Sequence, residues 1–169
     1  MLKEVEIIKG DLIKAGENII AHQVNCFTMG SGVAKQISGR YPAVKREHKL
    51  LCDQHENDRE WLLGRIQLID CTPKIVANLF GQYDYGNDGK LYTIYKYLYL
   101  GLERLFQYAK LNNLSVAIPY KIGCGKGGAD WVRVRYKINE LANRYNIVDK
   151  VKLYKLEAKP KTTNNKHFR

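Results

Sequence analysis

The spacing of apolar and polar residues divides this chain into alternating strands and helices. Val5–Ile8 alternates apolar and polar side chains, as a half-buried strand does, and Asn18–Val24 is a more continuous apolar run typical of a buried strand. Between Thr93 and Lys110 the apolar residues recur every three or four positions, which places them on one face of a helix. The expected strands are Val5–Ile8, Asn18–Val24, Gly64–Ile69, Lys74–Phe80, Leu114–Pro119 and Lys150–Leu156. The expected helices are Val33–Ser38, Tyr41–His55, Thr93–Lys110 and Trp131–Tyr145.

This order of elements predicts a single α/β domain with three layers, in which helices cover both faces of a mixed, largely parallel sheet. The strands that begin at Gly64 and Lys74 form a pair that turns near Thr72-Pro73. The helix that begins at Tyr41-Pro42 offers only a loose apolar face, made of Ala43, His48 or Leu50, Leu51 and Cys52. We expect the domain to cover residues 1–157 and the polar, basic residues 158–169 to form a disordered tail.

Composition adds information about partners and location. The 169 residues suffice for one hydrophobic core, and the formal net charge of +11 favours an anionic partner, either nucleic acid or a phosphorylated small molecule. The charge is spread along the chain, so most of it is expected to form a solvated surface. No apolar run approaches the roughly 20 residues that span a bilayer, and the N-terminus has no signal-peptide pattern. We therefore expect a cytoplasmic protein without membrane contact.

The four cysteines give no sign of a metal centre or of disulfide bonds. Cys26, Cys52, Cys71 and Cys124 are widely separated and form no Cys-x-x-Cys pair, which is the pattern of reduced thiols in a cytosol. Cys124 lies in a glycine-rich loop, but no histidine follows it before His167. We therefore expect Cys124 to be a small residue in a tight turn and not a nucleophile. Neither a metal nor a cofactor is expected.

Two segments have the order strand, glycine-rich loop and helix. In Ile118–Trp131, four glycines occur within six residues, and Asn25–Val33 repeats the arrangement earlier in the chain. Glycines let a ligand approach the backbone, and free amides at a helix start point toward negative charge, so each unit is suited to bind an anion. Tight turns alone are the competing interpretation for either loop. Both loops and the Gly10-Asp11 turn follow strands, where the ligand crevice of an α/β sheet lies.

Taken together, these loops resemble the macro domain, the ADP-ribose-binding fold, and especially its branch of phage and bacterial proteins that process ADP-ribose 1″-phosphate. The similarity extends from Ile7 to Tyr154 and implies the three-layer fold described above. Its most specific segments are His22–Asn25, Met29–Ala34, Asn78–Gln82 and Ile118–Gly125.

The resemblance implies a role for each loop. Asp11 accepts a hydrogen bond from the adenine amino group with the amide of Leu12 nearby, although turn capping is an equal alternative for Asp11. Asn25 holds the distal ribose through a side chain that both donates and accepts. Gln82 neighbours the same ribose. The residues implied at the diphosphate are Gly30, Ser31, Gly32 and Val33 on one side and Ile122, Gly123, Cys124, Gly125, Lys126 and Gly127 on the other.

The resemblance also implies candidate catalytic residues beside the distal ribose, namely Asp130, His22 and Asn25. A carboxylate or a neutral imidazole can orient water for attack on a 1″-phosphate. Competing structural roles are a helix N-cap for Asp130 and a core histidine bonded to the backbone for His22. The loop departs from the commoner family pattern because Lys126 replaces an apolar residue and Ala129 replaces a glycine. Lys126 either adds a cation at the diphosphate or points to water.

These expectations give one leading function and three alternatives. The leading function is binding of ADP-ribose and dephosphorylation of ADP-ribose 1″-phosphate to ADP-ribose, a hydrolase activity. The alternatives are removal of ADP-ribose from a modified macromolecule, non-catalytic recognition of ADP-ribose, and nucleic-acid binding through the net positive charge. Some macro domains use a lysine or an acidic residue for removal, and Lys90, Lys121 and Lys126 cannot be matched securely to such a lysine. No segment resembles a base-reading motif.

Overall fold

The computed structural model describes residues 1–158, which form a six-stranded sheet with four α-helices. The strands are β1 (Glu6–Lys9), β2 (Ile19–Val24), β3 (Ile66–Cys71), β4 (Lys74–Phe80), β5 (Val116–Pro119) and β6 (Val151–Lys155). The helices are α1 (Gly32–Arg40), α2 (Pro42–Gln54), α3 (Tyr95–Asn112) and α4 (Trp131–Arg144). Short 3-10 helices are η1 (Leu12–Lys14), η2 (Arg59–Leu62) and η3 (Val148–Lys150).

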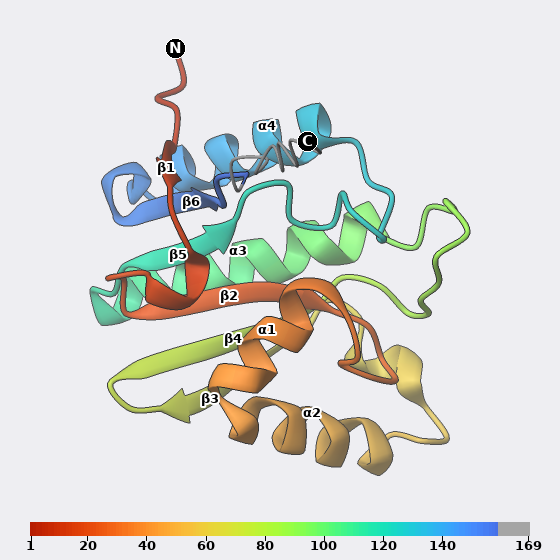
Figure 1. Cartoon of the computed structure of the whole chain (residues 1–169). Coiled ribbons are helices and arrows are strands. Elements are labelled where there is room, and N and C mark those ends of the chain that lie inside the picture. Colours follow the sequence, from red (N-terminus) through yellow and green to blue (C-terminus); the bar gives the residue numbers. More distant parts are fainter. Residues whose placement is uncertain (159–169) are drawn as a thin grey trace, which may run out of the picture.

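The strand order is β1-β6-β5-β2-β4-β3, and all neighbours are parallel except the antiparallel hairpin β3–β4 (Figure 1). The predicted mixed, largely parallel sheet is therefore confirmed. The hairpin turns at Thr72-Pro73, as expected. In the register of the sheet, His22 lies opposite Asn78 on β4, and Asn78 lies opposite Gln67 on β3.

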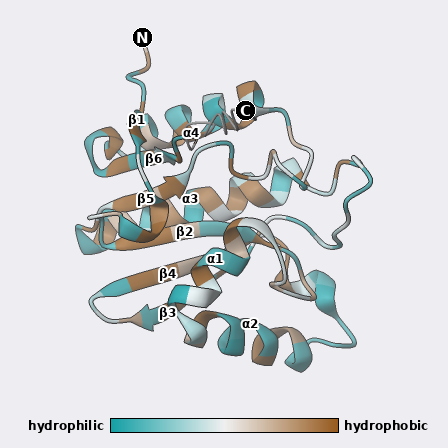
Figure 2. Ribbon diagram, viewed as in Figure 1, coloured by the Kyte–Doolittle hydropathy of each residue, from teal (hydrophilic) through white to brown (hydrophobic). Residues whose placement is uncertain are grey.

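Helices cover both faces of the sheet, which confirms the three-layer architecture. Alternate residues of β2 enter different cores: Ile19 and Ala21 pack with α3 and α4, whereas Ile20 and Val24 pack with α1 and α2. Hydrophobic residues concentrate along the central strands, whereas α2 contains many hydrophilic ones (Figure 2). Burial of both faces explains why β2 is apolar along most of its length.

Several element details differ from the expectation. The buried face of α2 consists of Val44, His48 and Cys52, while Ala43 and Leu51 are half-buried and pack against the same core, so the predicted face missed only Val44. The buried residues recur every four positions, and this regular period was not recognised in the sequence. Helix α1 continues two residues beyond its expected end, and α3 begins at Tyr95 because Thr93 is in an extended bridge with Gln82. The 3-10 helices were not predicted.

Two further expectations bear on the chain as a whole. The predicted tail, residues 158–169, lies outside the described residues after Ala158. Within residues 1–158, no helix is both long and apolar enough to span a membrane. Cys26, Cys52, Cys71 and Cys124 are free thiols.

Candidate functional site

The topology of the sheet places a crevice between β2 and β5. These two strands are adjacent and parallel, but the helix after β2 packs on one face of the sheet and the helix after β5 packs on the other. The loops that leave the two strands must therefore separate at their carboxyl ends. Such a switch in direction is where open α/β sheets bind ligands. The loops that separate here are the two predicted glycine-rich loops.

The loop after β2 is fixed by the side chain of Asn25. Its Oδ1 accepts hydrogen bonds from the amides of Phe27 and Thr28, each at 2.8 Å. The donor half of this amide side chain is therefore the part that no other residue occupies in this structure. Residues 30–33, which lead into α1, are exposed. None of their backbone amides donates a hydrogen bond within the described residues. This loop thus presents amide donors at the start of a helix.

The loop after β5 presents a second set of free amides. Those of Gly123, Gly125, Lys126 and Gly127 donate no hydrogen bond within residues 1–158, whereas the amide of Gly128 donates to the carbonyl of Gly125 at 3.1 Å. Gly125 and Lys126 are exposed. The two loops therefore bring amide donors to both sides of one crevice, which is an arrangement suited to a diphosphate.

A partly buried chain of hydrogen bonds joins the loop after β5 to β2 and to the segment after β4. The side-chain amide of Gln23, on β2, donates to Thr93 Oγ1 at 2.8 Å and to Gln82 Oε1 at 2.7 Å. Thr93 Oγ1 donates in turn to the carbonyl of Gly123 at 2.8 Å. Sequence reasoning missed Gln23 and Thr93, although a glutamine in an otherwise apolar strand was a signal. Gln82 also donates to the carbonyl of Asp84, so its side chain is occupied within the protein.

The glycines of these loops serve two different purposes. A Cβ atom added at Gly127 would lie 2.4 Å from Thr93 Oγ1 and 2.5 Å from the carbonyl oxygen of Gly123, so this glycine is required by packing. A Cβ added at Gly32 or Gly125 would meet nothing within 4 Å. The loop after β5 is therefore both a tight turn and an open surface, and the two interpretations of its glycines apply to different residues.

Asp130 closes the second loop as the N-cap of α4. Its Oδ1 accepts from the amide of Val132 at 2.9 Å, and its own amide donates to the hydroxyl of Tyr95 at 2.9 Å. The predicted capping role is therefore confirmed. The second carboxylate oxygen has no hydrogen-bond partner within the described residues, and the residue is exposed. This oxygen is available to a ligand or to water.

Asp11 caps η1, and its Oδ1 accepts from the amide of Ile13 at 3.0 Å. The capping alternative is therefore confirmed, and one carboxylate oxygen remains for another partner. β1, which precedes Asp11, lies three strand spacings from β2, or about 14 Å. Asp11 and Asn25 thus lie well apart along the same edge of the sheet, as an elongated ligand with a central diphosphate requires.

His22 is enclosed in the core on the side of α1 and α2. Only 1% of its surface is exposed, and its Nε2 lies 2.5 Å from Asn78 Oδ1. The predicted core histidine is confirmed, but its partner is a side chain and not the backbone. Burial lowers the pKa of His22 to about 4, although the hydrogen bond to Asn78 opposes this change. The imidazole is neutral at pH 7 and is separated from solvent.

Two other residues implied at the ligand have inward-facing side chains. Ile122 is 3% exposed and packs in the core with α3 and α4, so only its backbone faces the loop. The thiol of Cys124 lies 3.4 Å from the carbonyl of Ile122. Burial raises the pKa of Cys124 to about 11, and the nearby Asp130 carboxylate adds to this effect. A protonated, inward-facing thiol agrees with the expected structural role and not with a nucleophile.

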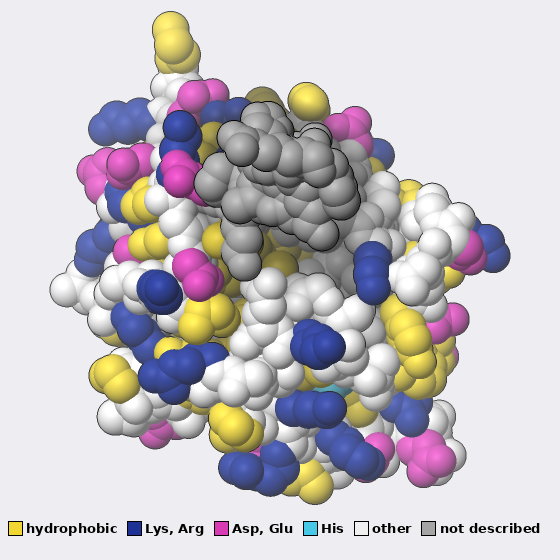
Figure 3. Space-filling view, in the orientation of Figure 1, with side chains coloured by type: hydrophobic (Ala, Val, Ile, Leu, Met, Phe, Trp, Pro, Cys, Tyr) yellow, Lys and Arg dark blue, Asp and Glu magenta, His cyan; other side chains and the backbone are white. Residues whose placement is uncertain are grey.

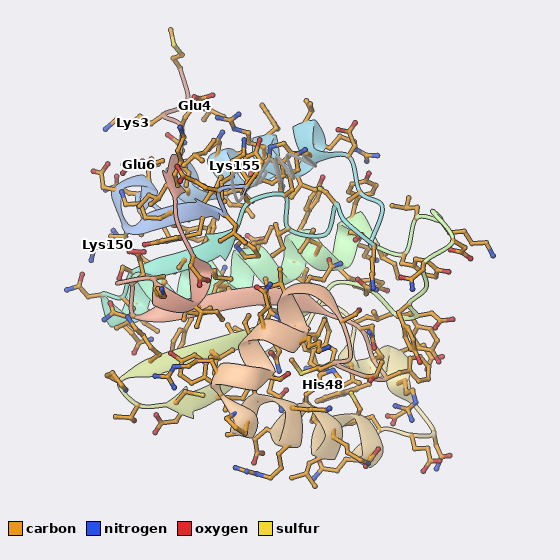
Figure 4. All side chains as sticks on the ribbon, in the orientation of Figure 1. Lys3, Glu4, Glu6, His48, Lys150 and Lys155 are labelled. Atoms are coloured by element: carbon orange, nitrogen blue, oxygen red, sulfur yellow. The ribbon has the colours of Figure 1, made fainter. Side chains whose placement is uncertain are left out.

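Two side chains that support the loop after β2 were not predicted from the sequence. His48 Nε2 lies 2.9 Å from the carbonyl of Asn25, and Arg59 donates to the carbonyl of Cys26 at 2.8 Å. His48 is 1% exposed, lies on the inner side of α2 and stacks on Phe80 (Figure 4). Arg59 also covers the ring of Phe27 at 4.5 Å. Both residues are distant from the loop in sequence, and no local pattern links them to it.

A cavity of about 440 Å³ lies elsewhere, at the opposite end of β4. Asp70, Thr72, Lys74 and Tyr108 are among the residues that line it. Because β4 begins at Lys74 and ends beside the crevice, this cavity is separated from the glycine-rich loops by the length of the strand. It therefore forms no part of the site.

The fold and the crevice define a doubly wound α/β domain that is suited to bind an elongated anionic ligand at a topological switch point. The chain is 30% identical over 148 residues to the DNA ADP-ribosyl glycohydrolase of Mycobacterium tuberculosis, across 84% of this chain. It spans 40% of the length of that relative. It is also 30% identical over 149 residues to an uncharacterized 17.5 kDa protein of Enterobacteria phage T4, which it covers to 94%. No family model matches the chain.

Solved structures give the family. The macrodomain of Mycobacterium tuberculosis DarG superposes with a TM-score of 0.75 and 25% identity, covering 88% of this chain and 95% of that one. A macrodomain protein from Streptomyces coelicolor superposes with a TM-score of 0.73 and 26% identity, covering 90% and 99%. This chain belongs to the macro domain family, as its motifs predicted.

Proposed function

We propose that this macro domain binds ADP-ribose in the crevice between β2 and β5 and hydrolyses ADP-ribose 1″-phosphate to ADP-ribose and phosphate. The observation that carries the proposal is the convergence of two sets of free backbone amides, at residues 30–33 and at Gly123 and residues 125–127, beside the free carboxylate oxygen of Asp130. Amide donors from two sides can share the charge of a diphosphate. The name of the mycobacterial relative, an ADP-ribosyl glycohydrolase, supports the ligand class.

The parts of the ligand are assigned to residues in order along the crevice. Asp11 receives the adenine amino group through its free oxygen, with the amide of Leu12 beside it. The two glycine-rich loops hold the diphosphate, and Lys126 adds a cation at their exposed rim. The side-chain NH2 group of Asn25 donates to the distal ribose, because its oxygen is already used within the loop.

The proposed hydrolysis requires a group that orients and deprotonates water. The free oxygen of Asp130 accepts a proton from water as the water oxygen bonds to phosphorus, and the bond from phosphorus to the ribose 1″-oxygen breaks. The departing oxygen takes up a proton, which gives ADP-ribose and inorganic phosphate. His22 is not assigned a direct role, because the imidazole is buried and bonded to Asn78. Asn25 positions the ribose and does not transfer a proton.

The test must separate the charge of Asp130 from its role as an N-cap. Asp130→Asn keeps a side-chain oxygen that can cap α4, whereas Asp130→Ala removes the cap at a cost of about 1 kcal/mol. We expect Asp130→Asn to retain ADP-ribose binding by calorimetry and to lose phosphate release from ADP-ribose 1″-phosphate by about 100-fold or more. Equal phosphate release by Asp130→Asn and wild type would contradict the role of the carboxylate.

A second candidate function is removal of an ADP-ribosyl group from nucleic acid. The similarity to a DNA ADP-ribosyl glycohydrolase across 84% of this chain favours it. The two functions share the crevice and differ in the group attached to the distal ribose. Wild-type protein that binds ADP-ribose but releases no phosphate, and that frees ADP-ribose from a modified oligonucleotide, has the second function and not the first.

A further inference from the structure

The charged side chains on α1 and the start of α2, up to Arg46, are all positive. The segment from Asn18 to Arg46 contains no Asp or Glu, and its Lys and Arg residues are all exposed. They are Lys35, Arg40, Lys45 and Arg46, which we call the α1–α2 basic face. Dark-blue side chains gather over these two helices in the space-filling view (Figure 3). We propose that this face binds the phosphates of a nucleic-acid strand whose ADP-ribosyl group occupies the crevice.

Acidic groups limit the basic face on its far side. Glu47 is half-buried and lies 3.7 Å from Arg46, and this carboxylate shares a depression of about 320 Å³ with Arg46 and Asp70. Toward the end of α2, Asp53 pairs with Lys49 at 2.6 Å. Exposed carboxylates continue beyond this pair at Glu56, Asp58 and Glu60. An anionic strand is therefore attracted to α1 and the first turns of α2 and repelled from the end of α2 and from η2.

The basic face is continuous with the crevice. Helix α1 begins at Gly32, where the free amides of the first loop lie, and it extends about 12 Å to Arg40. Lys35 lies one turn into the helix, and Arg40, Lys45 and Arg46 follow around the α1–α2 junction. A strand that enters the crevice through an ADP-ribosyl group thus meets cations in succession as it leaves. This proposal rests on the proposed ADP-ribose site, and it assigns a binding surface to the nucleic acid of the second candidate function.

The chemistry of the face favours nucleic acid over a lipid surface. Membrane-bound helices combine cations with a large apolar face. Here the exposed large apolar residues on α1 and α2 are only Val33 and Leu50, at opposite ends of the pair. Arginine and lysine without such an apolar face are the usual contacts to a phosphate backbone. The name of the mycobacterial relative, which acts on DNA, agrees with this partner.

The test uses two triple variants with matched loss of charge. Arg40→Gln, Lys45→Gln and Arg46→Gln together alter the basic face and leave Lys35, nearest the crevice, in place. Lys3→Gln, Lys110→Gln and Lys150→Gln remove the same charge elsewhere, and Lys3 and Lys150 lie far from α1 and α2 (Figure 4). Binding of fluorescent single-stranded DNA of about 20 nucleotides is measured by anisotropy across a salt series. ADP-ribose binding by each protein is measured separately by calorimetry.

We expect the basic-face variant to lower the salt slope of DNA binding by about 2 and the affinity by roughly 30-fold near physiological salt. The control variant binds DNA as the wild type does, and all three proteins bind ADP-ribose equally. Equal loss of DNA affinity in both variants, no DNA binding by wild type, or tighter binding to phosphatidylserine vesicles than to DNA would each overturn the proposal. Failure to bind ADP-ribose, with face-dependent DNA binding intact, rejects the proposed function and leaves the basic face as a nucleic-acid surface.

Discussion

Individual residues of the site serve the fold and the ligand at the same time. Asp11, Asn25 and Asp130 each use a side-chain oxygen to fix the local backbone, and each retains a polar group that is free. Capping holds a side chain in one orientation, so the free group is presented without a large loss of rotamer entropy. The alternatives of cap and ligand contact, which compete in the sequence, are therefore compatible in the structure.

Substitutions of two glycines in the loop after β5 test packing and ligand binding separately. Gly127→Ala brings a Cβ within 2.5 Å of two polar atoms, and we expect it to lower the free energy of unfolding by about 2 kcal/mol and Tm by about 6 °C. Gly125→Ala meets open space, so Tm should stay within about 1 °C while affinity for ADP-ribose falls about 10-fold, since a methyl group blocks the approach of the ligand. Thermal unfolding and calorimetry of both variants check the contrast. A stable Gly127→Ala protein would show that the loop can relax.

At the scale of elements, the first loop depends on α2 and η2. These elements form an excursion between β2 and β3, and they return His48 and Arg59 to the carbonyls of Asn25 and Cys26. Both donors come from buried or half-buried side chains, so an unpaired carbonyl after their loss has little access to water. The excursion therefore supports the ligand loop as well as covering the sheet.

We expect His48→Ala to lower the free energy of unfolding by about 3 kcal/mol, since it opens a cavity and removes the donor to Asn25. ADP-ribose affinity should fall as well, because Asn25 loses its support. Cys52→Ala is the matched control, because it shortens the neighbouring buried residue of α2, 3.5 Å from His48, without touching the loop. Denaturant unfolding and calorimetry check both variants. Unchanged ADP-ribose affinity in His48→Ala would contradict the supporting role.

At the scale of the whole molecule, one core combines apolar packing with buried imidazoles. His22 on β2 and His48 on α2 are almost fully buried between the sheet and the α1–α2 layer. A chain of side-chain amides from Asn78 to Gln67 links His22 to the carbonyl of Glu47. Burial lowers the pKa of both histidines, so the folded protein binds their protons more weakly than the unfolded chain does. The stability of the domain is thereby linked to pH.

The sign of this linkage follows from the pKa of His22, which is about 4 in the folded protein and 6.5 ordinarily. Stability is complete above pH 6.5 and is lost as pH falls toward 4, because the unfolded chain takes up the proton first. From pH 7 to pH 5, His22 alone should lower the free energy of unfolding by about 2 kcal/mol. Denaturant unfolding at both pH values checks the fall. His22→Gln should reduce it, and an imidazole that titrates near 6.5 in NMR spectra of the folded wild type would contradict the prediction.

Much of the architecture could be predicted because its signals are local. Continuous apolar runs indicate the buried strands β2 and β4. The three- to four-residue spacing of apolar residues indicates that α3 is a helix with one buried face. The glycine-rich loops and the caps at Asp11 and Asp130 are local as well, since a cap acts within two residues. His48 and Leu50 remained alternatives on the face of α2, because burial of a histidine is favourable only with a partner in space, which here is the carbonyl of Asn25.

The sequence by itself determined the order of strands and helices, the two glycine-rich loops and the residues that follow them, since these depend on local spacing and backbone freedom. The tertiary structure decided that β2 and β5 are neighbours whose helices diverge, which turns two separate loops into one crevice. It also decided that Gln23, Thr93, His48 and Arg59 hold those loops. Their hydrogen bonds join residues that are far apart in the chain, and such contacts exist only after the two layers have packed.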